Sequence, residues 1–127
     1  MKTIYISYAN EDLQTAVALR TALTARGVQC TLVDHTEYNP NGDVAADMLG
    51  SIKCADALVC VFSKHSNDSN FVSIELNAAV KREKKVYLMK TDRTAIDKKN
   101  NFVIANSVIL QSGTVEGAVA ELLPILQ

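Results

Sequence analysis

The residue whose surroundings most clearly indicate chemistry is Glu75. Residues 69–79 begin like a helix, because Ser69 or Asn70 can cap the first turn and apolar residues follow at once. Glu75 falls in the second turn, and its neighbours on the same helix face are all apolar: Phe71, Val72, Ala78 and Ala79. A carboxylate buried among apolar groups has a raised pKa, which is typical of sites that use a perturbed acid. The pattern also fits a side chain that reaches water at the edge of this face.

Five apolar runs predict the strands that must position this helix. They lie at residues 3–8, 28–33, 57–62, 86–89 and 108–110. The run at 57–62 is continuously apolar, as expected for a central parallel strand that is buried on both faces. These runs therefore predict a five-stranded sheet.

Helical periodicity fills the intervals between the strands. The first predicted helix runs from Asn10, its N-cap, to Gly27 at its C′ position. The second begins at Asp43, the third covers residues 69–84, and the last covers 113–126. The expected apolar stripes are Leu13, Ala16, Leu19 and Leu23 in the first helix and Val44, Met48 and Ile52 in the second. Residues 91–101 form a charged loop with room for a helical turn.

This alternation predicts an α/β fold in a single domain of residues 1–127. We expect a flavodoxin-like, doubly wound, five-stranded parallel sheet in the order 2-1-3-4-5, with helices on both faces. In such sheets ligands bind outside the C-terminal ends of the strands. The loops at residues 8–12, 34–42 and 63–70 gather at that edge, together with the start of the Glu75 helix. The topology therefore brings Glu75 to the expected binding site.

The composition narrows the class of protein. The 127 residues carry a net charge of −1, so there is no basic excess and we expect no nucleic-acid partner. No apolar run reaches membrane-span length, so no membrane partner is expected. His35 and His65 are isolated loop residues, and we expect no metal site. The cysteines form no C-x-x-C pair, which favours a reduced, cytoplasmic setting in which they serve as small core residues: Cys30, Cys54 and Cys60.

Two other families with this fold are disfavoured by the residues at the same edge. A phosphoacceptor receiver needs an aspartate at the end of the third strand and a lysine after the fifth. This chain has Phe62 and Ser63 at the first place and Leu110 and Gln111 at the second. A flavodoxin needs a phosphate-binding loop after its first strand, but residues 8–12 contain no glycine and two acids. Motifs rather than fold must therefore decide the function.

Three segments together resemble a TIR (Toll/interleukin-1 receptor) domain, in particular the short bacterial ones. Residues 4–12 resemble the first motif of the family, an F/Y-I-S-Y/H strand followed by an acidic residue. Residues 32–43 resemble the second strand and the polar BB loop. Residues 69–76 resemble the S-x-W-x-x-x-E-L segment, with Phe71 in place of the tryptophan. The resemblance covers about residues 2–126.

The resemblance implies an enzyme. Many bacterial TIR domains cleave NAD+ at the nicotinamide–ribose bond, and the catalytic glutamate of the family corresponds to Glu75. Cleavage builds oxocarbenium character on the ribose, which a fixed carboxylate stabilises, as in glycosidases. Capture by water gives ADP-ribose, and capture by the adenine gives a cyclic ADP-ribose isomer. NAD+ is then the substrate, and no cofactor is expected.

The resemblance also implies protein partners. Other TIR domains are expected to associate with this one in a homo-oligomer or filament, and this assembly is expected to switch on activity in anti-phage defence signalling. The alternative is a TIR scaffold that associates with other TIR domains through its BB loop and performs no chemistry.

The substrate-binding candidates surround Glu75 at the predicted edge: Tyr8, Ala9, Asp34, Ser63 and Phe71. Tyr8 and Ala9 are expected to form the wall of the site, whereas Ser7 is interpreted as a structural hydrogen-bonding residue. Asp34 either holds its own loop or meets the substrate, and Ser63 either contacts ligand or caps its loop. Phe71 either lines the nucleotide site or packs the helix, and it lacks the indole donor of tryptophan, which bears on substrate specificity.

Overall fold

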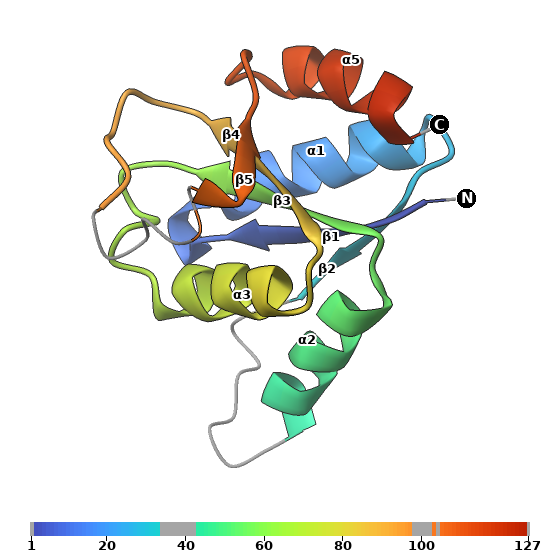
Figure 1. The fold of residues 1–127 in the computed structure, drawn as a ribbon. Helices are drawn as coiled ribbons and strands as arrows, with labels where there is room; N and C mark the ends of the chain where they lie inside the picture. The colour runs from blue at the N-terminus through green and yellow to red at the C-terminus, as the bar shows by residue number, and fades with distance from the viewer. Residues whose placement is uncertain (1, 34–42, 98–102, 104, 127) are drawn as a thin grey trace.

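The computed structural model describes residues 2–33, 43–97, 103 and 105–126 (Figure 1). Its sheet has five parallel strands, which are β1 (Thr3–Tyr8), β2 (Gln29–Leu32), β3 (Ala57–Phe62), β4 (Lys85–Lys90) and β5 (Ser107–Ile109). They lie in the order β2-β1-β3-β4-β5. The predicted strand order and the predicted α/β class are both confirmed.

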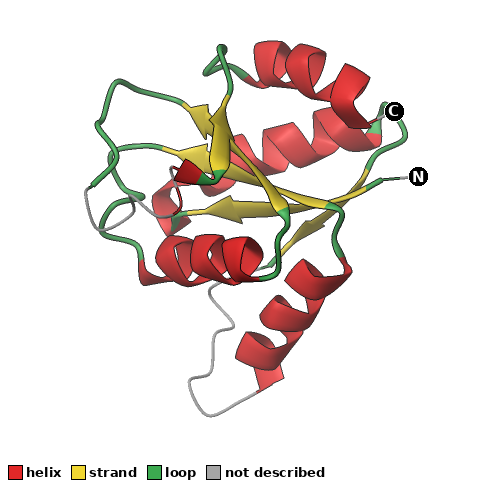
Figure 2. Cartoon of the chain, in the orientation of Figure 1, coloured by secondary structure: helices red, strands yellow, loops and turns green. Residues whose placement is uncertain are grey.

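Helices cover both faces of this sheet, as predicted (Figure 1). A 3-10 turn, Asn10–Asp12, leads into α1 (Leu13–Thr24), and the chain continues with α2 (Asp43–Cys54), α3 (Asn70–Lys81) and α5 (Val115–Leu126). One hydrophobic core lies between the sheet and helices α1 and α5, and a second lies between the sheet and helices α2 and α3. Residues 91–97, the described part of the predicted loop after β4, contain neither helix nor strand (Figure 2).

Strand β1 is central, and its alternate side chains enter the two cores. Ile4, Ile6 and Tyr8 lie in the core under α1 and α5, whereas Tyr5 lies in the core under α2 and α3. Ser7 follows Tyr5 by two residues and therefore faces the same side. Strand β3 beside it is also buried on both faces, as its continuous apolar run predicts. The face shared by Tyr5 and Ser7 is thus the face that α3 covers.

Several helix ends differ from the predictions, since α1 ends at Thr24 and α5 begins at Val115. Asn10 lies inside the 3-10 turn and is not an N-cap. Asp12 directly precedes α1 but makes no side-chain cap bond, because its carboxylate accepts a hydrogen bond from Ser63 instead. Helix α3 ends at Lys81 rather than at residue 84, since Glu83 has a left-handed φ of 58° that an α-helix does not accommodate.

Two residues predicted to be in the core are exposed. Leu13 is 39% exposed because it is the first residue of α1, whereas the rest of its predicted stripe is buried. Cys60 is buried and Cys30 is half-buried, but Cys54 is exposed. Cys54 is the last residue of α2, and Ile52 two residues earlier occupies the core-facing side of that turn.

Two kinds of feature are not found in the part of the chain that the structure describes. No helix there is both long and apolar enough to cross a membrane. No group of three or more histidine, cysteine, aspartate or glutamate side chains among those residues could hold a metal ion. The buried polar groups that need explanation lie instead around α3 and the C-terminal ends of β1 and β3: Ser7, Ser63, Ser66 and Glu75.

Candidate active site

The start of α3 positions Glu75. The hydroxyl of Ser69 accepts a hydrogen bond from the backbone N–H of Val72 at 3.3 Å, so Ser69 is the N-cap, as one of the two predicted alternatives had it. This cap makes the helix begin directly after the loop that follows β3. Glu75 then lies in the second turn with 0% of its surface exposed. The interpretation that Glu75 reaches water at the helix edge is therefore wrong.

Two hydroxyl groups of β1 hold the Glu75 carboxylate. The phenolic hydroxyl of Tyr5 donates to Oε2, and the hydroxyl of Ser7 donates to Oε1 at 3.0 Å. One strand can supply both donors because side chains two residues apart point to the same face. Each carboxylate oxygen therefore has a hydroxyl partner in the interior, which offsets part of the cost of burying the group.

Burial dominates the electrostatics of Glu75. It raises the pKa of the Glu75 carboxyl to about 8, although the hydrogen bonds from Tyr5 and Ser7 lower it. Burial has this effect because the charged form loses its hydration, whereas the hydroxyl donors favour the charged form. At neutral pH Glu75 is therefore mostly a neutral carboxylic acid in this arrangement, close to the pH at which it ionises.

The neighbours of Glu75 stay protonated. Burial, and then the nearby charge of Glu75, raises the pKa of Tyr5 well above its usual range. The same two causes raise the pKa of the Cys60 thiol on β3. Tyr5 therefore keeps the hydroxyl proton that it donates to Glu75, and Cys60 is an unreactive thiol rather than a nucleophile. The group that titrates near neutral pH in this cluster is Glu75.

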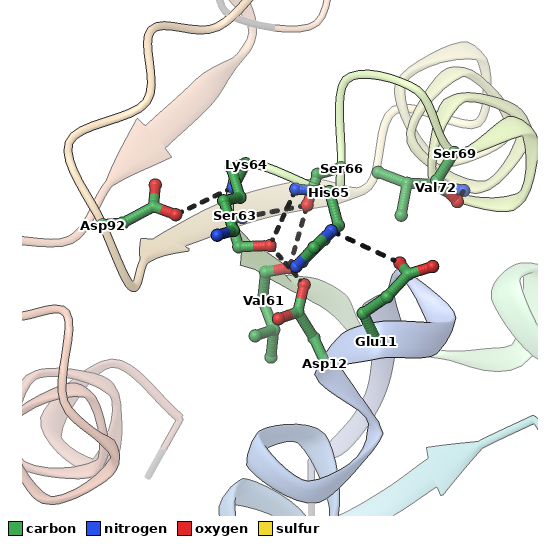
Figure 3. Close-up of polar contacts among 10 residues, drawn as sticks. All are labelled: Glu11, Asp12, Val61, Ser63, Lys64, His65, Ser66, Ser69, Val72 and Asp92. Atoms are coloured by element: carbon green, nitrogen blue, oxygen red, sulfur yellow. Dashed lines mark hydrogen bonds and ion pairs between the residues drawn. The ribbon is translucent and has the colours of Figure 1, made fainter.

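Ser63 joins the loops that follow β1 and β3 (Figure 3). It is 3% exposed, and its hydroxyl donates to Asp12 Oδ2 at 2.5 Å. The hydroxyl oxygen of Ser63 also accepts from the backbone N–H of His65 at 3.1 Å. The Ser63 N–H donates to the hydroxyl of the buried Ser66 at 2.9 Å. These contacts fix the two loops at the edge where ligands are expected.

A pocket of about 430 Å³ opens between these loops and the start of α3, and its described lining residues are Asn10, Glu11, Lys64, His65, Asp68, Ser69, Asn70 and Phe71. Figure 3 shows His65 and Glu11 side by side, with 3.8 Å between Nδ1 and the carboxylate. Phe71 lies one helical turn before Glu75 on the same face of α3. The pocket therefore ends about one turn from the buried carboxylate, which is not among its described lining residues.

The structure brings only some of the predicted residues together. Phe71 lines the pocket, and Ala9 is buried in the core under α2 and α3. Tyr8 lies on the opposite face of the sheet, where its hydroxyl donates to the Val33 carbonyl at 2.6 Å. Asp34 lies outside the described residues. Tyr8 and Tyr5 therefore lie in different cores, on opposite faces of the sheet.

The residue that the sequence analysis missed is Tyr5. A signal was present, because residues 5, 7 and 9 must share one face of the first strand while 6 and 8 share the other. The hydroxyl groups of Tyr5 and Ser7 lie in that first set, and Tyr8 lies in the second. Ser7 does form a structural hydrogen bond as expected, and its acceptor is Glu75 itself.

Comparison with known families decides what kind of domain this is. Residues 4–110 match the family model described as the TIR domain. The chain belongs to the TIR domain family. No curated protein matches its sequence significantly. The motifs at residues 4–12 and 69–76 thus belong to a TIR domain.

Solved structures resemble this TIR domain in fold. The Clostridium botulinum CMP N-glycosidase BcmB aligns with a TM-score of 0.72 and 16% identity, over 98% of this chain and 100% of that one. The TIR domains of the activated Roq1 resistosome, which directly recognizes the pathogen effector XopQ, align with a TM-score of 0.54 and 20% identity. That alignment covers 68% of this chain and 58% of the other. At these identities the likeness establishes the fold.

Proposed function

We propose that this TIR domain cleaves the nicotinamide–ribose bond of NAD+, with Glu75 as the catalytic carboxylate. The observation that carries the proposal is a buried carboxylate, held by two hydroxyl groups one helical turn from a polar pocket at the C-terminal edge of the sheet. Membership of the TIR family supports it. The similar fold of an enzyme named for an N-glycosidic bond of CMP supports the broader class of reaction.

The chemistry needs one ionised carboxylate. As the bond to nicotinamide breaks, positive charge develops on the ribose, and a fixed carboxylate beside it stabilises that charge. Nicotinamide leaves as a neutral molecule and needs no proton from the protein. The cationic substrate would itself lower the pKa of Glu75, because an opposite charge favours the ionised form. Water then gives ADP-ribose, or the adenine gives a cyclic isomer.

The pocket offers groups suited to a dinucleotide. Phe71 can stack on an aromatic ring of the substrate. Glu11 and Asp68 favour a cationic group such as the nicotinamide ring, and Lys64 favours a phosphate. Ala9 follows the last residue of β1 and is buried in the core under α2 and α3. We propose no cofactor in this scheme, since NAD+ is the substrate.

Access to Glu75 requires a change at this edge. Glu75 has 0% of its surface exposed, so substrate contact needs a rearrangement of the groups that cover it. We propose that self-association with other TIR domains supplies this change, in cytoplasmic anti-phage signalling. The Roq1 TIR domains, which this chain resembles in fold, are described in an activated resistosome.

One observation favours a second candidate, a TIR scaffold without chemistry. Both oxygens of Glu75 have hydroxyl partners in the interior, so the side chain can be explained as a structural link between α3 and β1. The scaffold would then act through TIR–TIR contacts alone.

Incubation with NAD+ at high protein concentration tests the proposal. Chromatography should detect released nicotinamide from the native protein and none from Glu75→Gln, which keeps the size of the side chain. Glu116→Gln, the same change at an exposed site on α5, should retain full turnover. Equal turnover by Glu75→Gln would refute the assignment. No turnover by any variant, even in crowded solution, would favour the scaffold. Release of cytosine from CMP, without release of nicotinamide from NAD+, would show that the substrate is CMP rather than NAD+.

A further inference from the structure

The hydroxyl of Tyr5 has no role in filling space. Tyr5 is fully buried in the core under α2 and α3, where a phenylalanine would occupy almost the same volume. Its oxygen instead lies at Glu75 Oε2, opposite the contact of Ser7 with Oε1. The hydroxyl is therefore directed at one group, the carboxylate that the proposed function uses.

On the basis of that proposed function, we infer that Tyr5 is a positioning residue for Glu75. Its hydroxyl, together with that of Ser7, fixes both carboxylate oxygens against β1 and supports the ionised form that bond cleavage needs. Tyr5 touches no substrate in this scheme and acts only through Glu75.

The groups packed around Glu75 determine how strongly Tyr5 stabilises its ionised form. Strand β1 contributes the two hydroxyls, and strand β3 contributes the thiol of Cys60, which stays protonated because burial and Glu75 raise its pKa. Tyr8, on the other face of β1, acts electrostatically on Tyr5. Helix α2 and strand β4 contribute apolar side chains to the same core: Met48, Ile52, Val86 and Leu88. Hydroxyl donors in such surroundings stabilise a charge more strongly than they do in water.

The direction of the effect follows from the donors. A hydrogen bond to a charged acceptor is stronger than the same bond to a neutral one, so Tyr5 favours the carboxylate over the carboxylic acid. Tyr5→Phe should therefore raise the pH at which Glu75 ionises by about one pH unit. A residue with a merely structural role would leave that pH unchanged.

The experiment compares Tyr5→Phe and Ser7→Ala with Tyr87→Phe. Tyr87 is a tyrosine of β4, 6% exposed, in the core under α1 and α5, and it serves as the matched control. The acidic limb of the kcat/KM profile for NAD+ should move about one pH unit upward in the first two variants, with roughly tenfold lower kcat/KM at pH 7 and little difference at high pH. Tyr87→Phe should match the native profile.

A second readout does not depend on turnover. Titration of the 13C-labelled side-chain carboxyl of Glu75 by NMR, assigned with Glu75→Gln, should show the same upward movement. An unchanged or lower midpoint in Tyr5→Phe, or increased activity at neutral pH, would overturn the inference. If Tyr5→Phe fails to fold, Ser7→Ala tests the same pair of hydroxyl donors, and an unchanged midpoint in that variant overturns the inference. A shifted titration in a protein without any NAD+ turnover would overturn the proposed function and leave Tyr5 as the residue that controls the ionisation of Glu75.

Discussion

Glu75→Gln should make the folded protein more stable, by an amount that grows with pH. The substitution keeps the shape of the side chain and can still hydrogen-bond to Tyr5 and Ser7, but it carries no charge. Burial raises the pKa of Glu75 to about 8, against an ordinary value of 4.5 that also applies to the unfolded chain. Between these pH values the unfolded chain has lost a proton that the folded protein retains. Raising the pH therefore favours unfolding of the native protein but not of the variant.

The size of the effect follows from the same two values. Below pH 4.5 the carboxyl is protonated in both states, and it makes no pH-dependent contribution. Each pH unit above that costs the native protein about 1.4 kcal/mol, which amounts to about 3 kcal/mol at pH 7. The cost levels off at about 5 kcal/mol above pH 8, where folded Glu75 ionises as well. A difference of 3 kcal/mol corresponds to roughly 10 °C in Tm for a chain of this size.

Urea unfolding at pH 5, 7 and 8.5 measures this difference directly. The free energy of unfolding of Glu75→Gln should exceed that of the native protein by a margin that widens across the series. Glu116→Gln removes a carboxylate from an exposed position on α5 and should stay within about 0.5 kcal/mol of the native protein at each pH. A difference between Glu75→Gln and the native protein that is the same at all three pH values would refute the reasoning.

Two further substitutions at the start of α3 test the site around Glu75. Ser69→Ala removes the helix cap and should lower the free energy of unfolding in urea by about 1 kcal/mol, whereas Ser73→Ala inside the helix should not; equal losses would contradict the capping role. Phe71→Ala removes an aromatic wall of the pocket and should raise KM for NAD+ by about tenfold or more with a smaller change in kcat, as initial rates would show. An unchanged KM would remove Phe71 from the proposed substrate site.

The fold could be predicted from the sequence because the local sequence patterns of strands and helices agreed with one another. Each buried strand is a run of apolar or β-branched residues, and each helix between them has an apolar stripe or a cap. The misplaced features were helix ends. At Asp12 and Glu83 the reason is visible, because a tertiary hydrogen bond and a left-handed backbone override local preference there. Such features depend on contacts or conformations that residue type alone does not specify.

The site could be predicted from the sequence only in part. Helical spacing assigns Glu75 to an apolar face, but it does not determine how deeply that face is buried. Strand alternation does assign Tyr5 and Ser7 to one face and Tyr8 to the other, so the shared face of Tyr5 and Ser7 could have been predicted. The hydrogen bond from Ser63 to Asp12 joins residues far apart in sequence, and only the folded arrangement of two neighbouring strands reveals it.

The stability argument bears on function as well. If Glu75 were only a link between α3 and β1, a glutamine could form that link without the charge that costs about 3 kcal/mol at pH 7. A buried carboxylate is therefore a poor choice for a purely structural role, whereas bond cleavage needs the ionised form that glutamine cannot provide. The NAD-cleaving enzyme and the scaffold thus differ in what Glu75→Gln should do. In the enzyme it exchanges activity for stability, and in the scaffold it increases stability without loss of function.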